Sequence, residues 1–200
     1  NEVIFQGDRL EPDYKDIPGQ WGKIWFSKGS LNNSIDWAII KNGGIGIQAD
    51  AISPLTPNAP TVKITNTIIR NMQAAAIFGQ GARIWSSNCV FANCGQYVAA
   101  LTLGGTYKFE QCTFANYWSG NSRSTPLLAL NNYYISTANQ YIVRGLDSAY
   151  FGNCILTGDV EEEIGIDSSI HGGKFNYKFE NCIIKTARST ANTIYYKNVY

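Results

Sequence analysis

Short runs of alternating apolar and polar residues recur along the chain, and most of them end at an Asn or Gln. In one copy, Val62 and Ile64 alternate with polar neighbours, Asn66 interrupts the run, and Thr67 and Ile69 resume it. Alternation with a period of two is typical of β-strands with one buried face. We therefore expect these four side chains to point inward on two short strands, with Asn66 at the turn between them.

The same copy continues into a second turn and a third strand. Ile68 is expected to point outward, Asn71 to close the second turn, and residues 76–78 to form the third strand. Equivalent third strands are predicted in the other copies at 45–47, 100–103, 127–130 and 164–166.

The position of Asn66 recurs at irregular intervals along the chain. Six copies are visible, with Trp37, Asn66, Asn88, Gln111, Asn153 and Asn181 at this marker position. They are separated by 29, 22, 23, 42 and 28 residues, so a base of about 22 residues carries longer insertions. That period predicts an all-β, single-stranded parallel β-helix of about six coils, each with three short strands. Neither a helical repeat nor a leucine-rich pattern is present, and a β-sandwich is the alternative.

The longest interval has two interpretations. One coil with insertions around 117–126 and 133–140 fits, and so do two coils of 21 residues. The second option places Asn132 at the marker and the large Tyr133 where other copies have a small residue, so the first is preferred. The remaining long intervals predict loops at 51–60 and 158–163.

Stacked coils place equivalent residues about 4.8 Å apart, one inter-strand spacing. An inward apolar column is expected from Ile40, Ile69, Phe91, Phe114, Leu156 and Ile184. A ladder of stacked amides is expected at the second turn, because each side-chain amide both donates and accepts. It would contain Asn71, Asn93 and Asn116.

Four of the five cysteines occupy one position of the repeat, directly after the marker: Cys89, Cys112, Cys154 and Cys182. Thr67 and Ala38 hold that position elsewhere, so it requires a small buried side chain, and Cys94 lies outside the column. We expect buried free thiols, with disulfides or a metal site as the alternatives. The cysteines therefore do not assign a cellular compartment.

Composition agrees with a globular β protein. The 200 residues carry 16 Lys and Arg against 15 Asp and Glu, a net charge of +1, which excludes a basic field for nucleic acid. No apolar run approaches the length of a membrane span, so no transmembrane segment is predicted. Both ends read as interrupted strands, so residues 1–200 are expected to be one β-helix segment of a longer chain.

Candidate chemistry is sparse. His171, the single histidine, follows Ile170 in a Gly-containing turn without a nucleophile elbow nearby. The acidic residues Asp159, Glu161, Glu162 and Glu163 offer oxygen donors for calcium, or form a solvated loop. No other cofactor is indicated.

Aromatic residues near the insertions are candidates for stacking on sugar rings: Tyr117, Trp118, Tyr133 and Tyr134, with Trp21 and Trp25 near the N-terminus. The same rings can instead cover the side of the solenoid or a neighbouring subunit.

The repeat resembles right-handed parallel β-helix proteins of the pectin-lyase-like superfamily, and more closely a group from the cell envelope of Bacteroidota. Residues 5–9, 17–24, 29–30, 39–42 and 149–154 carry the second resemblance. It implies an extracellular or cell-surface protein, an outer-membrane lipoprotein in many members. The superfamily's catalytic patterns do not transfer, because the Gly-His-Gly and paired-Asp motifs and the calcium cluster of pectate lyases are missing.

Two functions follow as expectations. The first is a non-catalytic envelope scaffold that binds a glycan or a protein partner. The second is a polysaccharide lyase or glycoside hydrolase with active residues partly outside this segment. Whether the chain is an enzyme stays open at this point.

Overall fold

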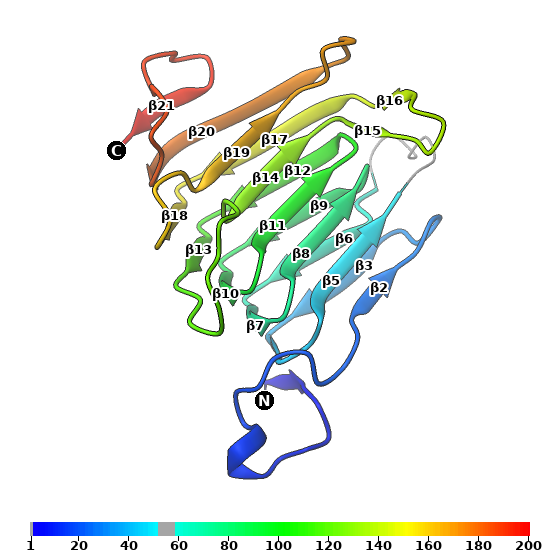
Figure 1. The fold of residues 1–200 in the computed structure, drawn as a ribbon, viewed down its shortest axis with the longest axis vertical. Coiled ribbons are helices and arrows are strands. Elements are labelled where there is room, and N and C mark those ends of the chain that lie inside the picture. The colour runs from blue at the N-terminus through cyan, green and yellow to red at the C-terminus, as the bar shows by residue number, and fades with distance from the viewer. Residues whose placement is uncertain (1, 52–58) are drawn as a thin grey trace.

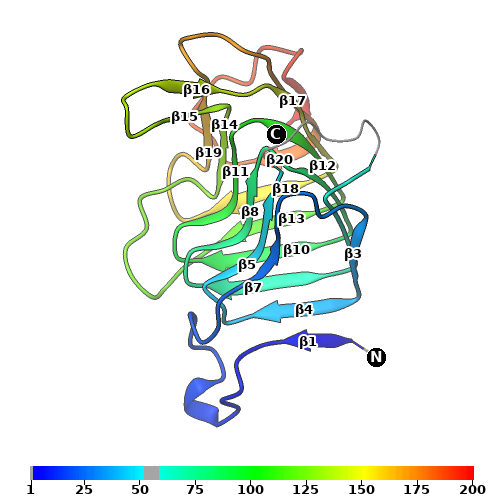
Figure 2. The same ribbon diagram turned by 90° about the vertical axis from the view of Figure 1, so that its right-hand side faces the viewer.

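The chain winds as a solenoid of three β-sheets in the computed structural model, which describes residues 2–51 and 59–200 (Figures 1 and 2). The predicted loop at 51–60 therefore lies largely outside the described residues. Each coil except the last contributes one strand to each sheet, and strands of successive coils pair in parallel. The prediction of an all-β parallel β-helix is confirmed.

We name the sheets A, B and C in chain order. Sheet A contains β1 (Val3–Phe5), β4 (Ala38–Lys41), β7 (Ile68–Met72), β10 (Val90–Cys94), β13 (Thr113–Asn116) and β18 (Ile155–Gly158). Sheet B contains β2 (Ile24–Phe26), β5 (Ile45–Asp50), β8 (Ala75–Gln80), β11 (Tyr97–Thr102), β14 (Leu128–Asn131) and β19 (Ile164–Asp167). Sheet C contains β3 (Asn33–Asp36), β6 (Val62–Thr65), β9 (Arg83–Ser87), β12 (Gly105–Glu110), β17 (Leu146–Gly152) and β21 (Tyr196–Val199).

Three further elements complete the fold. The long strand β20 (Phe175–Ile184) pairs first in sheet C and then in sheet A, so it joins the two sheets. An antiparallel hairpin of β15 (Tyr133–Ile135) and β16 (Tyr141–Val143) interrupts the coil after β14, and a 3-10 turn, η1 (Pro12–Tyr14), precedes β2. The hairpin confirms one coil with insertions over two coils of 21 residues.

The marker position is the corner between sheets C and A, which we call the C–A corner. All six marker residues adopt left-handed backbone conformations, with φ between 50° and 55°. Asn is the side chain that tolerates this region best after Gly, which explains its recurrence. Asn88 donates to Asn66 Oδ1 at 2.7 Å, and Asn66 donates to Asp36 Oδ1 at 2.8 Å. An amide ladder therefore exists at this corner.

The amide ladder predicted at the second turn is wrong in its members: Asn71 donates to Asn42 Oδ1 at 2.8 Å, and Asn93 and Asn116 do not continue the ladder. Asn71 and Asn93 have positive φ there, but the side chain of Asn116 turns inward and is fully buried. Its amide donates to the Cys94 carbonyl oxygen at 3.0 Å, and its Oδ1 accepts from the Cys94 amide at 2.9 Å. Asn93 Oδ1 accepts from the Tyr117 amide instead. The loop that follows Asn116 thus replaces the regular turn.

All five cysteines are buried free thiols, and four of them stack directly after the marker. Each of the four thiols donates to the carbonyl oxygen two residues before it, at 3.2–3.4 Å. Thr67 makes the same bond to Thr65 at 2.7 Å. The position therefore holds a small side chain in all six copies, and that side chain donates a hydrogen bond in every copy but the first, where Ala38 stands. A bond with the Cys112 thiol, and then burial, raise the pKa of Cys89, and burial raises the pKa of Cys94 to about 12.

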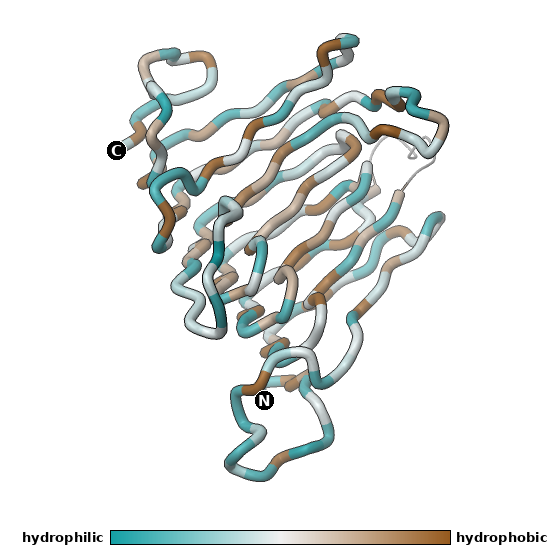
Figure 3. Tube along the Cα trace, in the orientation of Figure 1, coloured by the Kyte–Doolittle hydropathy of each residue, from teal (hydrophilic) through white to brown (hydrophobic). Residues whose placement is uncertain are grey.

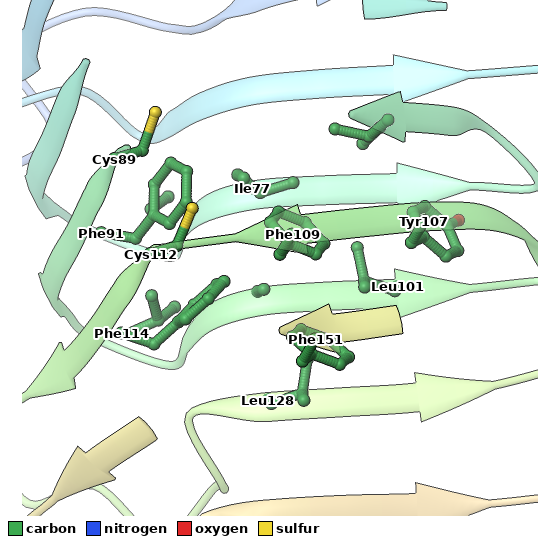
Figure 4. Close-up of a cluster of buried hydrophobic side chains, with 14 of the residues drawn as sticks. Ile77, Cys89, Phe91, Leu101, Tyr107, Phe109, Cys112, Phe114, Leu128 and Phe151 are labelled. Carbon is green, nitrogen blue, oxygen red and sulfur yellow. The ribbon is translucent and has the colours of Figure 1, made fainter. Parts of the chain in front are cut away.

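The interior is a column of apolar side chains. The predicted inward column aligns in register from Ile40 through Ile184. Phe91, Phe109, Phe114 and Phe151 meet at its centre with ring centroids 5.1–6.2 Å apart (Figure 4). Apolar and polar positions alternate along the strands around this core, as the period of two requires (Figure 3).

Candidate functional site

The outer face of sheet B carries two adjoining hollows that share Phe78, Thr102 and Asn131; together we call them the groove. The first has a volume of about 490 Å³ and the second about 560 Å³. The first is completed by Gln80, Leu103, Tyr133, Tyr134, Ile142 and Arg144. The second is completed by Tyr97, Ala100, Pro126, Ala129, Leu130, Gly165, Ile166, Asp167 and Arg188. Volumes in this range suit a small ligand or a few sugar units.

The floor of the groove is a column of three small residues that begins beside a phenylalanine ring. Phe78, Ala100, Ala129 and Gly165 align in register on β8, β11, β14 and β19. The Phe78 ring therefore stands above the sheet, and the surface is lower over the small residues that follow it. A Cβ at Gly165 would lie 2.7 Å from Pro126 Cγ, so only glycine fits beneath this proline.

A polar row runs beside the floor. Gln80, Thr102, Asn131 and Asp167 occupy the next outward position on the same four strands. Tyr133 donates its hydroxyl to Asp167 Oδ2 at 2.9 Å, and this bond, followed by burial, raises the pKa of Tyr133. Hydrogen-bonding groups thus follow one side of the floor, and apolar surface lies on the other.

Two insertions stand at opposite ends of the sheet B strands and bound the groove (Figure 1). The hairpin β15–β16 leaves β14 at its C-terminal end. Buried Asn132 anchors its base, accepting from the Ser169 amide at 2.8 Å and donating to the Lys174 carbonyl oxygen at 3.3 Å. Tyr133 stacks on Tyr141 with centroids 5.4 Å apart.

A buried ion pair fixes the opposite loop, residues 117–127. The side chains of Arg123 and Glu163 are both fully buried, with Arg123 Nη2 2.6 Å from Glu163 Oε1 and Nη1 2.9 Å from Oε2. Glu163 also accepts from the amides of Leu127 and Val160, at 2.8 and 3.1 Å. Arg123 further contacts Asp159.

These contacts keep the Arg123 guanidinium protonated despite its burial. Burial by itself lowers the pKa of Arg123, but the hydrogen bonds to Glu163 and Asp159 leave that pKa above its ordinary value. A Cβ at Gly158 would collide with the Glu163 carboxylate, so the pair also accounts for this glycine. The loop that carries Pro126 is therefore held rigidly at the edge of the groove.

The acidic run from Asp159 to Glu163 was predicted to bind calcium or to be a solvated loop, and neither prediction holds for Glu163. Both of its oxygens are occupied by Arg123 and backbone amides. Glu162 accepts from Thr186 and from the Ile164 amide, while Glu161 is exposed. Across residues 2–51 and 59–200, no group of three His, Cys, Asp or Glu side chains is arranged to hold a metal ion.

The structure separates the predicted stacking aromatics into two groups. Tyr133 and Tyr134 line the groove, and Tyr134 is 47% exposed. Tyr117 and Trp118 lie in the other loop and line neither hollow; Tyr117 bonds Thr157 at 3.0 Å, and Trp118 donates to Asn121 at 2.6 Å. Trp25 extends the floor column on β2. Trp21 donates to the Lys41 carbonyl oxygen.

Carboxylates on this face are too far apart for paired acid chemistry. Asp167 is the carboxylate that lines the groove, and Asp50 lies in the same row, four strand spacings away. That separation is about 19 Å, whereas glycoside hydrolysis needs two carboxyls within about 10 Å. His171 lines neither hollow and packs on Tyr141, with ring centroids 4.4 Å apart. Asp167 and Asp50 are therefore not placed to act as the two carboxyls of a glycoside hydrolase.

Sequence reasoning missed the groove floor and the ion pair. The floor has a signal in the repeat, because the outward position of successive third strands reads Phe78, Ala100, Ala129 and Gly165. The ion pair has none, since Arg123 and Glu163 lie forty residues apart in insertions outside the repeat.

The sequence model of one protein family, described as a right-handed β-helix region, matches residues 13–114. The match covers half of the chain, and the parallel coils agree with it, so the protein belongs to the right-handed β-helix family. No curated protein and no solved structure matches the chain significantly. In the described part of the chain, no helix has the length and apolar character needed to cross a membrane.

Proposed function

We propose that this β-helix is a non-catalytic, extracellular or cell-surface scaffold that binds a glycan in the groove of sheet B. The observation that carries the proposal is the floor of Ala100, Ala129 and Gly165, bordered by aromatic rings and by a polar row. A sugar chain presents apolar ring faces and hydroxyl edges, and this arrangement meets both.

The charges of the groove favour a glycan with acidic substituents. Arg144 lines the first hollow and Arg188 lines the second. Asp167 is the single carboxylate among the lining residues, so the two arginines outnumber the acidic groups. Asp167 already accepts the Tyr133 hydroxyl, and Arg188 Nε lies 3.7 Å from Glu162 Oε2. A guanidinium group pairs well with a carboxylate or sulfate because its donors match two oxygens at once.

Binding is tested on a panel of acidic and neutral polysaccharides by titration calorimetry. Replacing Tyr134 or Phe78 with Ala removes a ring that lines the groove, and each change is expected to weaken binding about tenfold. Ala129→Trp fills the floor and is expected to abolish binding. Tyr117→Ala is the matched control, because Tyr117 is 56% exposed and lies outside the groove.

Three results would contradict this proposal. If no polysaccharide binds, the ligand is not one of the glycans tested. If the Tyr117 and Tyr134 variants lose equal affinity, the binding site is not the groove. Release of unsaturated or reducing ends would support the alternative function, a lyase or hydrolase, in place of a binding scaffold.

A further inference from the structure

The outer face of sheet A carries a row of β-branched side chains, six aliphatic and one threonine, which we call the stripe. Its members align in register across seven strands: Ile4, Ile39, Ile68, Val90, Thr113, Ile155 and Ile183. Five of the seven are 37–54% exposed. Six strand spacings make the stripe about 29 Å long.

An exposed apolar row of this length indicates an interaction site. The stripe is flat and repeats at the inter-strand spacing, so a matching surface must carry the same period along the same length. The same sheet of a second copy meets that condition.

The two long edges of the stripe carry opposite charges. Lys41, Arg70 and Lys185 follow the stripe at the edge nearer sheet B, and Asp36, Glu110 and Glu180 precede it at the C–A corner. Arg70 and Lys185 already have intramolecular contacts, to Asp16 Oδ1 at 3.5 Å and to the Gly158 carbonyl oxygen at 2.8 Å. Glu110 and Glu180 are paired with neighbouring lysines of sheet C.

Lys41 and Asp36 give the clearest match. They belong to the same coil, on opposite sides of Ile39, and Asp36 is exposed, with Oδ1 accepting from Thr65 and Asn66. Hydrogen bonds from these two residues lower the pKa of Asp36, so this carboxylate is charged near neutral pH.

We propose that two copies of this chain associate face to face through the stripe, related by a two-fold axis that runs along it. This axis keeps each coil opposite the same coil of the partner and places Lys41 of one copy near the partner's Asp36. A two-fold axis along the strands would instead oppose the two basic edges. The contact covers about 600 Å² on each copy, at the lower end of stable interfaces, so micromolar affinity is expected.

The mass in solution tests this pairing. Sedimentation velocity between about 1 and 200 µM is expected to show a monomer–dimer equilibrium. Val90→Lys places two ammonium groups on the axis and is expected to raise the dissociation constant about 100-fold. Ile170→Lys is the control, because Ile170 is 83% exposed and lies outside the stripe. Cooperative melting of both variants establishes that they fold.

Cross-linking tests the orientation. The axis sets Val90 opposite the same residue of the partner, about 10 Å away across the two packed sheets, which is too far for a disulfide. Val90→Cys is therefore expected to give a dimer linked by a short bis-maleimide reagent, and Ile170→Cys is not. A wild-type chain that stays monomeric throughout the range overturns the proposal, even if it binds lipid vesicles or another protein through the stripe. So does a dimer that Val90→Lys leaves intact, or one that Val90→Cys fails to link.

Discussion

At the C–A corner two residues connect the strands in four coils and one residue does so in the first, whereas the connections on either side of sheet B vary from two residues to eighteen. The corner repeats one arrangement, a left-handed Asn or its substitute followed by a small side chain, which donates a hydrogen bond in every coil but the first. The sheet B side carries the hairpin and the loop 117–127, which bound the groove. Stacking constrains the first region coil by coil, and the second is free to vary because each insertion needs only its own anchors.

The largest effect is expected in the core that both regions share. Phe114→Ala removes a fully buried ring that contacts Phe91, Phe109 and Phe151, and we expect a loss of about 3–5 kcal/mol in the free energy of unfolding. Urea denaturation measures the change. Ile155→Ala, on the outer face of the next strand, is expected to cost under about 1 kcal/mol. Equal losses would show that the inward and outward faces have been assigned wrongly.

The second effect isolates the anchor of the loop 117–127. Glu163→Gln leaves the buried Arg123 guanidinium without its full counter-charge, and we expect a loss of about 2–4 kcal/mol. Proteolysis within the loop is expected to accelerate, because the loop loses its attachment. Combining Glu163→Gln with Arg123→Met removes the stranded charge and is expected to recover part of the loss. A double variant as unstable as the sum of both single variants would argue against the ion pair as the anchor.

The third effect tests the arrangement at the C–A corner. Asn88→Ala places alanine at a φ of 55° and removes the hydrogen bond to Asn66, so we expect a loss of about 1–2 kcal/mol. Asn88→Gly tolerates the backbone and loses only the hydrogen bond, with an expected cost of about 0.5–1 kcal/mol. Thermal melting orders the two variants. Should Gly prove as costly as Ala, the side-chain ladder rather than the backbone would explain the Asn repeat.

The smallest effect is electrostatic. Hydrogen bonds from Lys197 and Lys178 lower the pKa of Glu180 at the C–A corner to about 2, from an ordinary value of 4.5. A lowered folded-state pKa stabilises the protein above the unfolded-state value, and this stabilisation is lost as the pH falls from about 4.5 to about 2. Melting temperatures measured between about pH 6 and pH 2 are expected to fall less steeply in Glu180→Gln than in the wild type. Parallel curves would exclude Glu180 as a contributor.

Much of the regular region was predictable because stacking makes it repeat. The inward column from Ile40 to Ile184 and the buried cysteines follow from residues at equal positions in successive coils. The prediction failed at Asn116, where the pattern repeats but the chain leaves the turn for an insertion. Periodicity alone cannot show whether a repeated residue keeps its repeated surroundings.

The coil repeat could not predict the groove or the ion pair, for a related reason. Tyr133 and Tyr134 were identified as candidates from their place in an insertion, and they line the groove; Tyr117 and Trp118 had the same signal and do not. Whether the aromatic residues of an insertion reach the groove depends on how that insertion folds back over the sheets, and the local sequence does not determine this.

The amino-acid sequence by itself determined the coil, its period and its buried column, because each follows from alternation and from the conformational preference of Asn. Only the tertiary structure decided that Glu163 is an anchor rather than a metal ligand and that small residues on three strands form one groove floor. Those properties depend on contacts between residues far apart in the chain, because the partner of a buried charge and the residues that line a hollow come from different coils and loops.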